Sequence, residues 1–452
     1  MESWGLDRDC FIGIVTDTAA NMNSLGREIE GQWNTKYSRH LYCTDHTLQL
    51  TAVIAFSGSV AANNYAEDSS VGCLKKARDL VFFVNSSTAA NEKLARAQRT
   101  LNPEGAIYKL LQDVITRWGS TLKLVERVVK LEEPIKEIFQ QEFRNRTTVN
   151  QPTPLEKLYL SDEDFNGLRN IMYVLKPLQS AQTALEGDKY VSISLVPYIF
   201  HQLRIELELC LGAANADTQG DLILLLDKMI DDFKSRWGDE LRYTFETRRG
   251  DRNRQIGVHA YSYWAMALDP RTKKYLPKIL NHRDIRLLWE DIKECCLVEA
   301  RATRIENQEE DEEIDAAGAN DNLPVEQRNR RGAASFFPDS SDEEMEDFAL
   351  DASVEDILSN EFQKYQADKG LKLQTEGAYN CPLEWWTVHC SDYPHIWKVA
   401  EWILAIPATS APSERVFSAV ANIVDKKRVR LKPENVDLLV FLRGNKDFVD
   451  WG

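Results

Sequence analysis

Two carboxylates and one Cys/His pair stand where metal chemistry is feasible. Asp17 follows a short apolar run, and Glu414 falls at the start of a predicted helix just after Pro412. Carboxylate oxygens are ligands that Mg²⁺ accepts, while Cys43-x-x-His46 offers half of a four-ligand zinc site. Each has a simpler role as well. Asp17 suits a turn, Glu414 suits the positive end of a helix dipole, and no second Cys/His pair at finger spacing completes a zinc site.

The elements that position these residues are mostly helices. Residues 10–16 and 39–43 are short apolar runs typical of buried strands, each followed by a helical pattern, and this order predicts an α/β core. Helical patterns continue over 74–139, and the loop 147–154 marks a domain junction. Ser161 and Asp164 predict an acidic capping box that opens another helix. Near the C-terminus, apolar spacing predicts buried faces on helices over 397–404 and 416–424, with Ser410 as the cap of the second.

Five short motifs resemble landmarks of the hAT family of transposases, in that family's order. They are Gly13-Ile-Val-Thr-Asp17-Thr-Ala-Ala-Asn21-Met22, Cys43-Thr-Asp-His46, Thr116-Arg117-Trp118-Gly-Ser120-Thr, Leu268-Asp-Pro-Arg271 and the stretch from Ser410 to Asn445. The last resembles the C-terminal segment described as the family's dimerisation region. The resemblance implies a mixed α/β, mainly α fold, in which a partial RNase H-like core is interrupted by a large all-helical insertion.

The resemblance also implies a catalytic site. Asp17 and Glu414 match two of the three carboxylates that would hold Mg²⁺ or Mn²⁺ for two-metal DNA strand transfer. The first carboxylate belongs on an earlier strand, and Asp9 is too far along the same extended run to replace it. We therefore expect a remnant site that holds metal only if it is completed. The opening strands and the family's BED-type zinc finger are likewise expected to be missing from this sequence.

DNA contacts and self-association follow from the same resemblance. His46 is expected beside the DNA-handling edge of the site, and an exposed Trp118 next to Arg117 would stack on a base. The run Lys426, Lys427, Arg428, Arg430 and Lys432 would contact phosphates. Self-association would use the apolar residues Trp397, Trp402, Phe417, Val420, Leu439, Val440 and Phe441, which exceed what a helical hairpin can bury. Alternatively, these faces pack internally against the sheet of an intact RNase H-like fold.

Charge is distributed unevenly along the chain. The net charge is −16, but residues 299–347 hold 16 acidic and 5 basic residues, so the remainder is nearly balanced and a basic face is feasible. We expect four regions: 1–146, the N-terminal part of the core and the helices after it; 147–298, the helical insertion; 299–352, an acidic disordered linker; and 353–452, the dimerisation region that completes the core. No apolar run is long enough to span a membrane.

The sequence predicts a transposase-derived nuclear protein with DNA-binding and dimerisation activity, without a cofactor and without strand transfer as given. Two alternatives stay open. One is an active hAT transposase whose amino-terminal part precedes this sequence. The other is a domesticated transcription or chromatin regulator, and similarity to vertebrate BED-type relatives links it to SUMO transfer.

Overall fold

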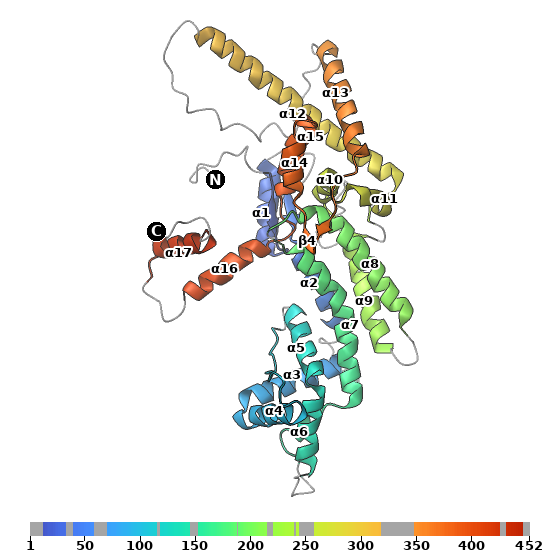
Figure 1. The fold of residues 1–452 in the computed structure, drawn as a ribbon, viewed down its shortest axis with the longest axis vertical. Helices are drawn as coiled ribbons and strands as arrows, with labels where there is room; N and C mark the ends of the chain where they lie inside the picture. Colours follow the sequence, from blue (N-terminus) through green and yellow to red (C-terminus); the bar gives the residue numbers. More distant parts are fainter. Residues whose placement is uncertain are drawn as a thin grey trace. The chain divides into compact units, whose positions relative to one another are not determined.

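The structure is a computed structural model that describes residues 12–32, 39–57, 70–114, 118–144, 152–187, 189–214, 220–238, 241–243, 257–317, 348–424 and 431–445 (Figure 1). These residues are mainly helical, as predicted. The chain forms two compact units. Unit 1 comprises 1–47, 184–198 and 241–452, and unit 2 comprises 48–183 and 199–240.

Unit 1 contains the predicted strand–helix–strand unit. Strands β1 (Ile14–Thr16) and β2 (His40–Tyr42) pair in parallel, with Val15 opposite Leu41, and helix α1 (Ala20–Gln32) connects them. Helix α2 (Thr44–Ser57) begins directly after β2. A glycine at position 26 lets α1 lie close to β2, because a Cβ there would stand 2.0 Å from Nδ1 of His40. Both expected strands are present. They are a small part of the RNase H-like core that the resemblance implies.

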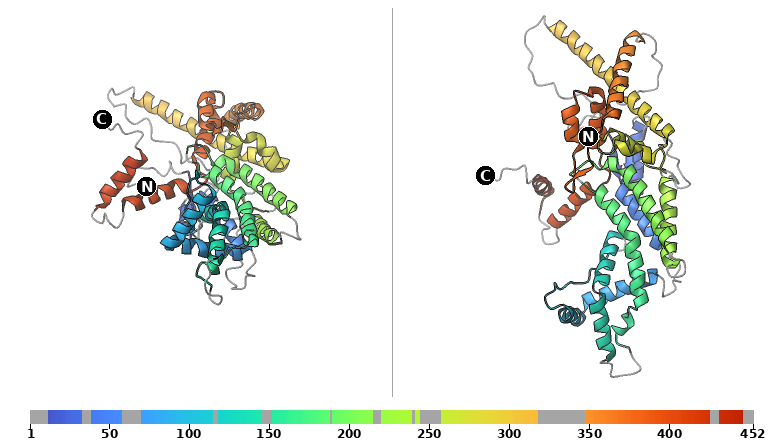
Figure 2. Two further views of the ribbon diagram at one scale, coloured as in Figure 1. Left: turned by 60° about the horizontal axis from the view of Figure 1, so that its bottom comes forward. Right: turned by 45° about the vertical axis from the view of Figure 1, so that its right-hand side comes forward.

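The rest of unit 1 is a helical scaffold. Its helices are α10 (Ala260–Leu268), α11 (Leu276–Ile279), α12 (His282–Ala317), α13 (Phe348–Ala367), α14 (Pro382–His389), α15 (Pro394–Ala405), α16 (Ala411–Ile423) and α17 (Pro433–Gly444). Short 3₁₀ turns η4 (Ile193–Leu195) and η5 (Lys273–Tyr275) and the hairpin β3 (Gln374–Thr375) and β4 (Ala378–Tyr379) complete it. Helices α13 and α15 pack on α12 (Figure 2). Trp264, Tyr365 and Trp386 are among the fully buried large aromatic residues of unit 1.

Unit 2 is all helical. It contains most of α2, then α3 (Ser70–Ser86), α4 (Thr88–Leu101), α5 (Trp118–Lys130), α6 (Glu132–Arg144), η3 (Glu156–Leu158), α7 (Asp162–Leu185), α8 (Val196–Ala213) and α9 (Gly220–Trp237). The predicted capping box at the start of α7 is confirmed. Asp164 N donates to Ser161 Oγ at 3.2 Å, and Ser161 N donates back to Asp164 Oδ2 at 2.9 Å.

The region boundaries differ from the sequence-based ones. Unit 2 already begins at Leu48, so the helices over 70–144 belong to the same compact unit as α9 and most of α7 and α8. Both ends of the expected disordered linker 299–352 are helical, and its residues 318–347 lie outside the described residues. Helix α12 continues through Ala317 and α13 begins at Phe348, because helical propensity persists into the acidic stretch; Glu and Ala are good helix formers.

No helix among the described residues is both long enough and apolar enough to cross a membrane.

Candidate functional site

Asp17 lies at the carboxyl end of β1, as predicted. Its side chain is half-buried, and Oδ1 accepts a hydrogen bond from the backbone N–H of Ala19 at 3.0 Å. This bond orders the turn that leads into α1. Asp17 therefore has the structural role of a turn residue. The same hydrogen bond fixes its carboxylate at the end of β1.

Glu414 occupies the first turn of α16, with Pro412 at the position where a helix tolerates proline. Its side chain is exposed, and Oε1 accepts a hydrogen bond from the Ser410 hydroxyl at 3.1 Å. The prediction for Ser410 is only half right. It is the N-cap residue, but its hydroxyl bonds to the Glu414 carboxylate and not to a backbone N–H of the helix.

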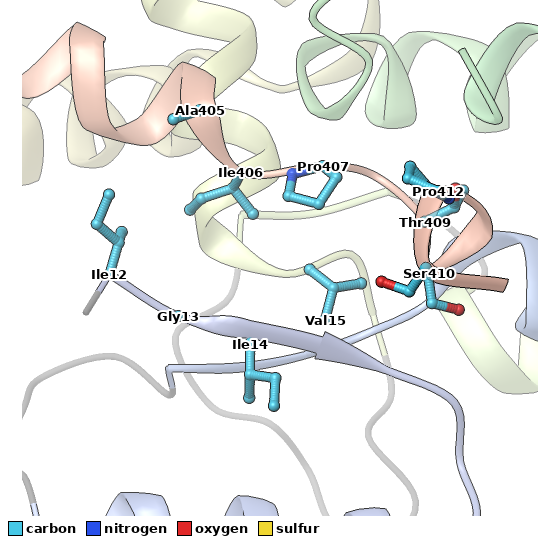
Figure 3. Close-up of a pocket in the computed structure, with 11 residues that line it drawn as sticks. Ile12, Gly13, Ile14, Val15, Ala405, Ile406, Pro407, Thr409, Ser410 and Pro412 are labelled. Atoms are coloured by element: carbon cyan, nitrogen blue, oxygen red, sulfur yellow. The ribbon is translucent and has the colours of Figure 1, made fainter. Parts of the chain in front are cut away.

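Residues Cys43 and Thr44 tie the β1–β2 pair to the loop that precedes α16. The backbone N–H of Cys43 donates to Thr16 O at 2.6 Å, and the thiol of Cys43 accepts from the N–H of Ser410 at 3.3 Å. Thr44 donates to Ala408 O through its backbone N–H at 3.2 Å and its hydroxyl at 2.8 Å. Through these bonds, the residue before Asp17 and the cap residue before Glu414 are both attached to Cys43. These bonds therefore hold the end of β1 and the loop before α16 next to the same residue, Cys43. Figure 3 shows this loop opposite β1.

A buried ion pair supports this loop from the scaffold side. Ser192 Oγ accepts from Ala408 N at 3.2 Å, and two residues later Ser194 Oγ donates to Asp269 Oδ2 at 2.6 Å. Asp269 and Arg271 pair at 2.6 Å with both side chains fully buried. Arg271 also donates to the carbonyl of Val191 at 2.9 Å. The Leu268–Arg271 motif thus braces the 191–194 segment, which in turn holds the α16 loop.

Sequence reasoning missed these supporting residues. Ser192, Ser194 and Thr44 carry no local signal, because their partners lie far away in the chain. Arg271 was recognised only as part of a motif.

Two histidines lie beside β1. His46 Nε2 and the hydroxyl of Thr18 are hydrogen-bonded at 3.0 Å, next to Asp17. His40 Nε2 and the hydroxyl of Thr16 are hydrogen-bonded at 2.7 Å, and both residues are buried. Cys43 is buried beneath the site, and this burial raises the pKa of its thiol. In this arrangement Cys43 is a packed, protonated thiol that positions Ser410.

The carboxylates of the described residues do not make a complete metal site. Two-metal strand transfer needs three converging carboxylates, but in the described part of the chain no group of three or more His, Cys, Asp or Glu side chains stands close enough to hold an ion. Asp17 and Glu414 also already accept hydrogen bonds from Ala19 and Ser410. Asp17 and Glu414 alone would fall one carboxylate short of such a site.

The expected base-stacking role of Trp118 is wrong. Trp118 begins α5 and is only 3% exposed, so its ring belongs to the core of unit 2 and offers no face to a base. The neighbouring Ser120 instead bonds to the backbone N–H and carbonyl of Val114 at 2.8 and 3.0 Å. Arg117 and the basic residues Lys426, Lys427, Arg428 and Arg430 lie outside the described residues.

The C-terminal helices expose apolar side chains. Six large apolar residues in this region are at least two-fifths exposed. They lie on α16, on α17 and at the position just after α16. We call them the C-terminal apolar surface: Val416, Phe417, Val424, Leu438, Leu439 and Phe441. Phe417 is 72% exposed and Phe441 is 62% exposed. Helix α17 packs on α16 but has no buried residue (Figure 2).

The helix expected over 416–424 is confirmed, but its apolar face is not buried within one chain. Val420 and Val440 are only half-buried. By contrast, α15 packs into the scaffold as predicted, with Ala400, Ile403 and Leu404 buried. Trp397 and Trp402 on that helix are half-buried and add less to any exposed surface.

Comparisons with known proteins agree with this arrangement. Residues 361–445 match the hAT family C-terminal dimerisation region, and residues 42–161 match the ZBED1 RNase-like helical domain. The first match runs from the end of α13 through β3, β4 and α14 to α17, and the second covers mostly helices of unit 2. The fold and its C-terminal helices thus define a mainly helical protein with a dimerisation region of the transposase type.

Individual relatives support the same assignment. Zinc finger BED domain-containing protein 4 of Homo sapiens is 22% identical over 450 residues, which are 98% of this chain and 32% of that protein. Putative AC transposase of Zea mays is 32% identical over 103 residues, 23% of this chain and 12% of that protein. Putative transcriptional regulator tpeD of Talaromyces stipitatus is 22% identical, over 95% of this chain and 45% of that protein. Together these matches support a hAT-family, transposase-derived origin of the chain, which spans less than half the length of each of these relatives.

Proposed function

We propose that this chain is a nuclear DNA-binding protein that self-associates through its C-terminal apolar surface. The exposure of Phe417 and Phe441 carries the proposal. Contiguous large apolar side chains are seldom left in water by a soluble protein unless they mark an interface. Burial of a Phe side chain contributes about 1.5–3 kcal/mol, so covering Phe417 and Phe441 with a second chain would favour association.

Co-purification of two differently tagged copies tests the self-association. We expect the two wild-type copies to co-purify. When both copies carry Phe441→Asp, the second tag should no longer be recovered with the first. Val388→Asp is the matched control, since Val388 on α14 is also 72% exposed but lies outside this surface. Equal recovery of the second tag with Phe441→Asp and with the control would refute the interface.

DNA binding is the second part of the proposal. It rests on the family, on the clustered Lys426, Lys427, Arg428 and Arg430, and on the placement of His46 beside Asp17. Replacing the four basic residues by Ala should lower affinity for DNA of any sequence and reduce the slope of log K against log salt by about 3–4. A variant that keeps the wild-type slope would exclude these residues as phosphate contacts.

Catalysis is proposed to be absent from this polypeptide by itself. Asp17 and Glu414 are proposed as the two remaining members of an RNase H-like acidic site that requires a further carboxylate before it can bind Mg²⁺ or Mn²⁺. A strand-transfer assay with either ion tests this. Product that forms with the wild type and disappears with both Asp17→Asn and Glu414→Gln would show that the chain is an active transposase.

A regulatory role is the alternative that one finding favours. The fungal relative that aligns with 95% of this chain is named a putative transcriptional regulator. A DNA-binding dimer without strand transfer would suit that role. SUMO transfer has no residue in its favour here, and a SUMO-transfer assay would be its test.

A further inference from the structure

Helix α5 of unit 2 carries a row of positively charged side chains (Figure 1). Lys123, Arg127 and Lys130 are four and then three residues apart, so they follow one another along one side of the helix. Lys123 and Lys130 are exposed, and Arg127 is half-buried. At about 1.5 Å of rise per residue, the row extends over roughly 10 Å. We call these three residues the α5 basic face.

Tyr108 holds two of these cations in place. The centre of its ring lies 3.7 Å from Nζ of Lys130 and 5.0 Å from Cζ of Arg127, and an aromatic ring attracts cations at this distance. Arg127 also donates to the carbonyl of Lys109 at 2.7 Å. The backbone of Tyr108 is fixed by the buried Gln98, which donates to its carbonyl at 2.9 Å and accepts from its N–H at 2.8 Å. The positions of both cations are therefore set before any anion binds.

No carboxylate neutralises the α5 basic face among the described residues. Other cations of unit 2 do have carboxylate partners, such as Arg78, which pairs with Asp113 at 2.7 Å. Helix α5 contains one acidic residue, Glu126, and it forms no ion pair with its basic neighbours. The local potential is therefore positive. The hydrogen bond from Lys130 and the charges of Lys130 and Arg127 lower the pKa of the Tyr108 hydroxyl accordingly.

A row of cations on a helix is complementary to a row of anions at short, regular spacing. Each strand of duplex DNA presents one phosphate per about 3.4 Å of helix axis, so about three phosphates fall within the length of this face. Contacts to phosphates position a protein on DNA but carry no sequence information. The ligand that this face fits is therefore a phosphodiester backbone of any sequence.

We propose that the α5 basic face contacts the phosphate backbone of duplex DNA. This inference rests on the proposed DNA binding of the chain, and it adds a second group of phosphate contacts, on unit 2, to the basic residues 426–430. Each of Lys123, Arg127 and Lys130 would neutralise one phosphate. Together they would contribute about 2.7 to the slope of log K against log salt.

Salt dependence of DNA binding by the full-length chain tests the proposal, with short duplexes of two unrelated sequences. Lys123→Gln combined with Lys130→Gln should lower the slope by about 1.8 for both duplexes. If the two proteins bind equally at 1 M salt, this corresponds to about thirtyfold weaker binding of the variant at about 0.15 M salt. Lys228→Gln combined with Lys234→Gln is the matched control, because it removes the same charge from α9 of the same unit. The control should keep the wild-type slope.

Lysine acetylation of the wild type, measured by mass spectrometry, locates the contact without any substitution. Duplex DNA should protect Lys123 and Lys130 and leave Lys228 and Lys234 reactive. A wild type that binds neither duplex would refute DNA binding by this chain, and the α5 basic face with it. A wild type that binds DNA while Lys123 and Lys130 stay reactive, or a double variant with the wild-type slope, would refute the α5 basic face alone. Protection by polyglutamate but not by DNA would assign the face to an acidic protein segment and overturn the proposal.

Discussion

Thr44 and Ala408 are 364 positions apart, yet Thr44 gives two hydrogen bonds to one carbonyl, that of Ala408. The same carbonyl belongs to the loop that opens α16, two residues before Ser410. This contact attaches the start of α2 to the C-terminal region. Because α2 begins directly after β2, the contact also connects the β1–β2 pair to the matched dimerisation region.

Loss of the Thr44 hydroxyl should loosen this attachment. Thr44→Val keeps the shape of the side chain and removes one of the two bonds to Ala408, so we expect the free energy of unfolding to fall by about 1 kcal/mol. Denaturant unfolding measures it. Thr387→Val is the control, since the Thr387 hydroxyl is exposed and bonds only to Leu383 O within its own helix. Equal decreases in the free energy of unfolding of the two variants would show that the hydrogen bond from Thr44 to Ala408 stabilises the fold no more than the exposed bond of Thr387.

The Asp269–Arg271 pair should be costly to break and cheaper to replace. Arg271→Met leaves the Asp269 carboxylate buried without its counter-charge, and we expect a loss of about 3–5 kcal/mol. Replacing both residues, with Asp269→Leu added, removes the stranded charge and should recover at least about 1 kcal/mol of that loss. A double variant less stable than Arg271→Met would contradict this assignment. Thermal and urea unfolding of the three proteins provide the comparison.

Lys273 should give unit 1 a pH-dependent stability. Burial lowers the pKa of its ammonium group to about 8, against the opposing effect of Asp368. The group is therefore harder to charge in the folded than in the unfolded state, so the folded state loses its proton first and stability rises with pH above 8. Between pH 7 and 9 the wild type should gain about 1 kcal/mol relative to Lys273→Met. If the free energy of unfolding changed with pH in the same way for both proteins over this range, Lys273 would not titrate there.

Trp118 should behave as a core residue and not as a DNA contact. Trp118→Ala empties a buried site at the start of α5, and we expect a loss of about 3–5 kcal/mol in stability. Trp118→Phe should retain most of the packing, and its DNA affinity should equal that of the wild type. A folded Trp118→Phe protein with at least tenfold weaker DNA binding would restore the stacking role.

Local patterns predicted much of the fold because their causes are local. Apolar spacing located α15 and α16, and the Ser161/Asp164 pair located the start of α7, since a capping box is completed within four residues. The beginning of the acidic linker was harder to place. Composition favoured a disordered linker, but the same Glu and Ala residues extend α12 through residue 317.

The candidate site was only partly predictable for the opposite reason. The motifs drew attention to Asp17, Cys43 and Glu414, but the hydrogen bonds that hold the loop before α16 involve Thr44, Ser192 and Ala408, which no short pattern distinguishes. Burial is also a property of the whole fold. Trp118 and Phe417 are both aromatic residues on predicted helices, yet one is in the core and the other is in solvent.

Sedimentation equilibrium of the purified chain tests the central claim most directly, that the C-terminal apolar surface joins two copies. We predict a concentration-dependent dimer for the wild type and for Val388→Asp, and a monomer for Phe417→Asp with unchanged circular dichroism. Loss of one buried Phe should weaken the dimer by at least about tenfold, from about 1.5–3 kcal/mol of burial. A wild-type monomer at tens of micromolar, or a dimer that Phe417→Asp leaves unchanged, would contradict the account.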